Sequence, residues 1–204
     1  MKKIIRRYFI LGSLFFASSY AYAQDCPQPK KIVPKIIWKA TPVSINSDHT
    51  VRELQSLQLS KGHNPNTEGR RFKTVLGFYE SYKAITILPK LYKTTHRDGK
   101  VCYDMEDIMI EVDFQPKIYL SLEAMQFQCS KARIYEHELK HHDIDVTALN
   151  MLPDFMRNHG YKNLMRIQYN YMNGLGNEQS TNAVLQESIQ EIIDYLATQT
   201  DPLN

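Results

Sequence analysis

The chain has 204 residues, of which 43% are hydrophobic and 23% are charged. That length and composition suit one globular domain and exclude a disordered, collagen-like or coiled-coil chain. The formal net charge of +3 depends on four basic residues near the N-terminus; without that segment 21 basic residues face 22 acids, which gives no reason to expect nucleic acid as a partner.

Residues 1–23 are expected to form a signal peptide. They combine a basic start, the apolar run Tyr8–Ala17 and the sequence Ala21-Tyr22-Ala23, which predicts cleavage after Ala23. The apolar run is too short to span a bilayer, so no stable membrane span is expected in the mature chain. We therefore expect an exported protein, periplasmic or secreted.

Residues 24–35 are rich in proline and are expected to form an extended lead-in to a single domain over residues 36–204. A short strand is predicted at Ile36–Trp38, and a helix at 50–58, capped by Ser47 or Asp48. Turn-forming and charged residues at 60–71 predict a surface loop.

The middle of the chain is rich in β-branched and aromatic residues and predicts strands. The expected strands are Phe72–Glu80, Tyr82–Leu88, Asp107–Phe114 and Lys117–Leu122, with a tight turn at Asp98-Gly99. Helices are expected afterwards at 130–151, 154–172 and 180–198, separated by Pro153 and by Gly174 and Gly176. This order predicts an α+β fold, with a mainly antiparallel sheet followed by a C-terminal helical half.

The first long helix contains the one motif that carries chemistry, the H-E-x-x-H sequence from His137 to His141. Two histidines one turn apart lie on the same face of a helix, so both imidazoles can bind one zinc ion (Zn²⁺). Glu138 projects about 100° round the helix from His137, where a carboxylate can act as the general base on a zinc-activated water.

Other residues of this helix allow alternatives. The stripe Tyr135, Leu139, Val146 and Leu149 is expected to be the core face, with the two histidines on a neighbouring stripe. His142 is an extra ligand, a histidine at the core edge or a partner of Glu138. Asp145 accepts the far N–H of a ligand histidine or is a plain surface acid. The whole motif can also be a solvated helix face with incidental histidines.

His137, Glu138 and His141 match the signature of zincin metallopeptidases, so the chain resembles that family over these five residues. The helix and the preceding strand at Lys117–Leu122 are similar to the zincin edge strand and active-site helix. The pattern also resembles small secreted bacterial proteins that carry a strand, a cysteine and then an H-E-x-x-H helix.

The resemblance implies a third zinc ligand, and this chain departs from one version of it. No metzincin-type continuation follows, because Ile144 and Thr147 stand where the glycine and the third histidine are awaited. In the gluzincin pattern the third ligand is a glutamate on a later helix, often after asparagine. Glu178, which follows Asn177, resembles that feature, and Glu187 and Glu191 are its rivals.

Export would permit disulfides, and the mature chain has three cysteines. Cys102 precedes a predicted strand and Cys129 precedes the motif helix, so a Cys102–Cys129 bridge would join helix and sheet. Cys26 would then be free. The absence of a C-x-x-C pair argues against a zinc–thiolate site.

The sequence therefore predicts an exported zinc-dependent hydrolase, and more specifically a metallopeptidase. Its substrate would be a peptide or protein, with cell-wall peptide as one candidate. The alternative is a non-catalytic periplasmic protein that binds zinc structurally or presents an interaction surface. A closed site with four protein ligands would favour that alternative, whereas an open coordination position beside Glu138 would favour the enzyme.

Overall fold

The structure is a computed structural model, and it describes residues 26, 28, 30–60 and 75–200. The expected signal peptide, its cleavage site and nearly all of the predicted loop at 60–71 lie outside the described residues. So do the first residues of the strand predicted from Phe72. The described part of the proline-rich lead-in carries no helix or strand before Lys35.

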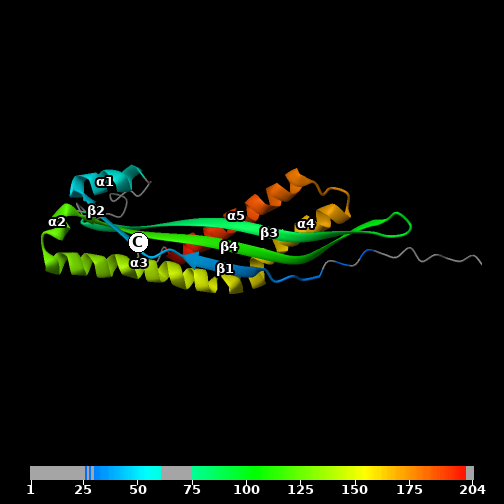
Figure 1. The fold of residues 1–204 in the computed structure, drawn as a ribbon, viewed down its shortest axis with the longest axis horizontal. Helices are drawn as coiled ribbons and strands as arrows, with labels where there is room; N and C mark the ends of the chain where they lie inside the picture. Colours follow the sequence, from blue (N-terminus) through cyan, green and yellow to red (C-terminus); the bar gives the residue numbers. More distant parts are fainter. Residues whose placement is uncertain (1–25, 27, 29, 61–74, 201–204) are drawn as a thin grey trace, which may run out of the picture.

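A mixed sheet forms the N-terminal half of the described chain. Its strands are β1 (Lys35–Ala40), β2 (Ser44–His49), β3 (Gly77–Thr95) and β4 (Val101–Ser121). β3 pairs antiparallel with the whole length of β4, and the resulting hairpin extends along most of the molecule (Figure 1). Because β3 occupies one edge of β4, β1 and β2 share the other edge, where both run parallel to β4.

The sheet therefore differs from the mainly antiparallel arrangement expected. The long pair β3–β4 is antiparallel, but both short strands are parallel to β4. The local residue pattern does not indicate in which direction a strand runs relative to a distant partner. The strand at Lys117–Leu122 is also not an edge, because this end of β4 lies between β3 and β2. The predicted zincin-like edge strand is thus wrong for that segment.

Two predicted breaks in the strands do not occur, and the position of Pro116 explains one of them. β1 pairs with β4 as far as Phe114 and β2 begins its pairing at Lys117, so Pro116 lies at the gap between them. The hydroxyl of Ser44 donates to the Pro116 carbonyl at 3.4 Å, which places the proline's backbone groups on that edge. The missing N–H therefore removes no ladder hydrogen bond, and β4 continues through the proline.

The turn predicted at Asp98-Gly99 is confirmed. The backbone N–H of Gly99 donates to the carbonyl of His96 at 3.0 Å, and Gly99 has a φ of +84°, a conformation that favours glycine.

The helices follow the predicted segments with shifted ends, except for the short α2, where no helix is predicted. They are α1 (Val51–Ser60), α2 (Leu122–Met125), α3 (Gln128–Phe155), the π-helical turn η1 (Met156–Gly160), α4 (Tyr161–Met172) and α5 (Glu178–Thr200). The cap of α1 is Thr50 rather than Ser47 or Asp48, because Thr50 and Glu53 exchange hydrogen bonds in a capping box. Pro153 lies inside α3, and the irregularity falls just after it, in η1.

The main core lies between the sheet and the three long helices. Alternate residues of β4, from Ile108 to Phe114, form this core together with residues of α3, α4 and α5, which run along or cross the hairpin in Figure 1. α1 packs on the opposite face, where Leu54 joins Phe78 and Tyr119 in a second cluster. None of the helices in the described ranges is long and apolar enough to cross a membrane.

The disulfide differs from the one expected. Cys102 is bonded to Cys26, and Cys129 is exposed with a free thiol, so the predicted Cys102–Cys129 bridge is wrong. The physical reason is distance along the hairpin. At about 3.3 Å per residue, β4 separates Cys102 from the start of α3 by on the order of 60 Å, whereas bridged Cα atoms lie within about 7 Å.

Candidate functional site

The motif lies in the first half of α3, where this helix approaches the edge strand β3 closely. Gly77 makes the approach possible, because a Cβ there would lie 2.5 Å from Cγ2 of Ile134 on α3 and 2.9 Å from the Tyr119 carbonyl oxygen. The missing side chain brings the backbone of β3 against the helix just before His137, Glu138 and His141.

The two histidines of the motif face one another. Their ring centroids are 5.1 Å apart and the ring planes are nearly perpendicular, at 87°. His137 is exposed and His141 is half-buried. Burial lowers the pKa of His141, as does the neighbouring His137, while the charge of Asp145 acts in the opposite direction. The neutral imidazole, which is the metal-binding form, is therefore favoured at His141.

Glu138 is turned into the junction of helix and sheet. Its side chain is buried, which raises the pKa of the carboxyl to about 7, and a hydrogen bond from the backbone of Tyr79 opposes part of that rise. A carboxyl with such a pKa can accept and return a proton near neutral pH. Glu138 thus contacts β3, whereas the sequence suggested only that it flanked the metal ligands.

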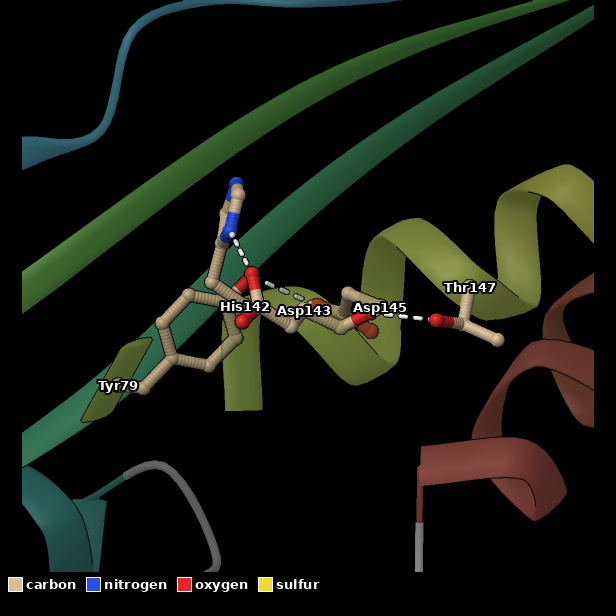
Figure 2. A network of polar contacts seen from close by, with 5 residues as sticks. All are labelled: Tyr79, His142, Asp143, Asp145 and Thr147. Atoms are coloured by element: carbon tan, nitrogen blue, oxygen red, sulfur yellow. Dashed lines mark hydrogen bonds and ion pairs between the residues drawn. The ribbon is translucent and has the colours of Figure 1, made fainter. Parts of the chain in front are cut away.

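Asp145 is buried and has two partners on β3. The hydroxyl of Tyr79 donates to one carboxylate oxygen at 2.8 Å, and the ammonium of Lys83 lies 2.8 Å from the other. Lys83 also donates to the hydroxyl of Ser81 at 2.7 Å. Burial and the charge of Asp145 raise the pKa of Tyr79 far above its usual range, so its hydroxyl stays protonated. Figure 2 shows Tyr79 beside this part of α3.

These contacts correct both interpretations of Asp145. It is not a surface acid, and its hydrogen bonds go to Tyr79 and Lys83 rather than to a ligand histidine. Its influence on His141 is electrostatic.

His142 is a histidine at the core edge, one of the three alternatives open for it. Its ring packs on Phe114 at 5.8 Å between centroids and meets Tyr79 edge-on at 6.4 Å. Its Nδ1 lies 3.3 Å from the carboxylate of Asp143, and Asp143 in turn accepts a hydrogen bond from Thr147 through its carbonyl (Figure 2).

The buried face of α3 is not the stripe expected. Its buried residues are Glu138, Asp145, Ala148, Leu149 and Leu152. Only Leu149 belongs to the predicted core stripe. An apolar stripe does not predict buried acids, and Glu138 and Asp145 are buried because β3 supplies partners for both.

The glutamates implied as third ligand do not join the two histidines. Glu187 pairs with Arg166 and Glu191 with Asn163, so both face α4. Glu178 begins α5, which starts beside the end of α4, on the side of the molecule towards the hairpin turn and far from the start of α3 (Figure 1). Within the described parts of the chain, no three His, Cys, Asp or Glu side chains converge as a metal site.

The donor set therefore fits a metal ion in part. Two imidazoles at this separation, one of them favoured in its neutral form, can bind a single zinc ion, with His137 and His141 as ligands. A third protein ligand is not supplied by the described residues.

Three residues of the site were missed by the sequence analysis: Tyr79, Ser81 and Lys83. The signal was their spacing, because alternate residues of a strand share a face, and these three are polar where Ile85 and Ile87 continue the same face. A strand of mixed aromatic and charged residues gives no indication of which face is buried until the helix is placed on it.

No family model matches the chain, and comparison with curated proteins and with solved structures also finds no match. The likeness to zincins consequently depends on His137, Glu138 and His141 alone.

Proposed function

We propose that the protein is an exported zinc-dependent hydrolase that acts on a peptide or protein, for which cell-wall peptide is one candidate. The observation that carries the proposal is the facing pair of His137 and His141, 5.1 Å apart, with the buried carboxyl of Glu138 between them in sequence. The proposed export depends on the signal-like segment at residues 1–23.

The residues have distinct roles in this proposal. His137 and His141 bind the metal, and Glu138 takes a proton from the attacking water and returns it to the leaving group. Zinc, when bound, polarises the scissile carbonyl and makes water more acidic. The hydrogen bond from the Tyr79 backbone holds the Glu138 carboxyl in place beside the motif.

A specific observation also favours the non-catalytic alternative. Catalytic zinc sites usually have three protein ligands, and the described residues bring only two together. Glu138 is moreover engaged by β3. A module that presents an interaction surface would need neither a third ligand nor an accessible base, whereas a structural zinc site would need four protein ligands.

The first test is metal content. We expect the mature protein to bind about one zinc per chain. His137→Ala and His141→Ala should each abolish tight binding because each removes one imidazole. His96→Ala, in the hairpin turn, is a matched control that should keep the wild-type content. Metal analysis of the purified variants decides the matter, and wild-type stoichiometry in the His137→Ala/His141→Ala double variant would contradict the metal site.

The second test separates the two function classes. Glu138→Gln should retain zinc but lose hydrolysis by on the order of a hundredfold to ten-thousandfold, because an amide cannot accept a proton at neutral pH. The measurement is chelator-sensitive cleavage of a peptide library and of cell-wall fragments. Cleavage that is unaltered in Glu138→Gln would show that the base is misassigned. No cleavage by the zinc-loaded wild type would favour the non-catalytic module.

A further inference from the structure

The face of β3 that meets the helices changes character along its length. Ile85 and Ile87 pack in the apolar core, but the three preceding positions on the same face are Lys83, Ser81 and Tyr79. These are joined by hydrogen bonds or an ion pair to one another or to α3.

The face of α3 that packs on β3 also changes from apolar to polar in the same region. Ala148, Leu149 and Leu152 are apolar and buried, whereas Glu138 and Asp145 are acidic and buried. An ion pair in such a place is, on average, no more stabilising than apolar side chains of similar volume. Buried polar clusters of this kind are typical of functional sites, where they hold reactive groups in position.

Tyr79 is the residue through which this cluster reaches the motif. Its backbone hydrogen-bonds Glu138, and its ring lies nearly parallel to that of His141, at 9° and 6.3 Å between centroids. Its hydroxyl is anchored on Asp145, which Lys83 fixes from the other side. One residue of the strand thus contacts two of the three motif residues and is itself held at its far end.

We propose that Tyr79 is a positioning residue, anchored by Asp145 and Lys83, which sets the orientation of the His141 ring and of the Glu138 carboxyl. The proposal rests on the proposed function in so far as His141 is a zinc ligand. If zinc is held by only two imidazoles of the described chain, its affinity depends strongly on how each ring is oriented. Groups that orient metal ligands typically contribute 10- to 100-fold to metal affinity.

The test compares two changes at Tyr79 with a control on the same strand, all in the full mature protein. Tyr79→Phe keeps the ring and removes the hydroxyl that bonds Asp145, and Tyr79→Leu removes the ring as well. Tyr82→Phe is the control, because Tyr82 is 63% exposed on the opposite face of β3. Zinc affinity is measured by competition with a chelator, and the fold is checked by circular dichroism.

A second readout needs no zinc. The imidazole signals of His141 are recorded by NMR in the metal-free protein, with His141→Gln used for assignment. If Tyr79 only stabilised the fold, the His141 signals of a folded Tyr79→Phe variant would match those of the wild type. A residue that orients His141 would displace them while the signals of His96, in the distant turn, stay unchanged.

We expect Tyr79→Phe to weaken zinc binding about tenfold, Tyr79→Leu to weaken it further, and both to displace the His141 signals. Affinity and signals that match the wild type in both variants would overturn the proposal, as would equal changes in Tyr82→Phe. If the wild type binds no zinc, the proposed function fails, and the His141 signals alone decide the positioning role. If Tyr79→Phe does not fold, Ser81→Ala replaces it: displaced His141 signals support the proposal and unchanged signals overturn it.

Discussion

The carboxyl of Glu138 differs from a free side chain in its protonation near neutral pH. Burial raises its pKa to about 7, so the folded protein favours the protonated form over a range in which the unfolded chain is ionised. The contribution to stability is therefore complete below the ordinary pKa of about 4.5, falls as the pH rises towards about 7, and then levels off. The protein thus keeps a buried carboxyl here at the expense of stability at neutral pH.

This linkage predicts the behaviour of Glu138→Gln in metal-free protein. Glutamine resembles the protonated acid, so the variant and the wild type should be equally stable near pH 4.5. Above pH 7 the variant should be more stable by on the order of 3 kcal/mol, because it never ionises. The lowered pKa of His141 gives a trend of the opposite sign in both proteins, which the comparison removes. Urea unfolding at several pH values, in the presence of a chelator, measures the difference in free energy of unfolding between the two proteins. A difference that does not change with pH would refute the buried carboxylate.

At the scale of elements, the site exists because α3 lies directly against β3. Sequence periodicity predicted both elements and the motif on the helix, since helical spacing and β-rich composition are local properties. It did not predict which residues of β3 face α3, nor that Glu138 and Asp145 are buried. Those facts depend on a contact between segments about 60 residues apart, as in the Tyr79–Asp145 bond.

The close approach at Gly77 gives a prediction at this scale. Gly77→Ala should destabilise the protein by about 1–3 kcal/mol, because the new methyl group would meet Ile134 and the Tyr119 carbonyl and push the helix from the strand. Gly99→Ala is no matched control, since the positive φ of Gly99 adds strain of its own. Ala84→Gly, on the same strand, is the better reference for backbone effects. Thermal unfolding and zinc affinity are the measurements, and an unchanged melting temperature would show that the contact is looser than described.

At the scale of the whole molecule, the fold class was predicted and the sheet was not. Strands followed by helices gave α+β, which the structure confirms at that level. The parallel partners of β4 could not be predicted, because β1 pairs with residues more than 70 positions away, as Lys35 does with Met109. The cysteine partner was missed for the same reason, since hairpin length decides which thiols can meet.

At this scale, the prediction concerns the Cys26–Cys102 disulfide and its contribution to stability. Peptide mapping without reductant should recover Cys26 joined to Cys102, and a thiol reagent should label Cys129 in the folded protein. Cys26→Ser should lower the free energy of unfolding by about 4 kcal/mol, because the bridge closes a long loop in the unfolded chain. Cys129→Ser is the matched control, which should leave stability nearly unchanged. Labelling of Cys26 or Cys102 in the untreated protein would contradict the assignment.

The position of that bridge also bears on the order in which the molecule assembles. The β3–β4 hairpin has its turn between adjacent strands, so its pairing can spread outward from residues already close in the chain. β1 must instead cross a separation of more than 70 residues to reach β4, which makes it the slower addition. Lys35 and Met109 pair in strands that run the same way, and Cys26 lies shortly before Lys35 as Cys102 lies shortly before Met109. Once oxidised, the two cysteines hold β1 near its parallel register, and a late, entropically costly encounter becomes a local one.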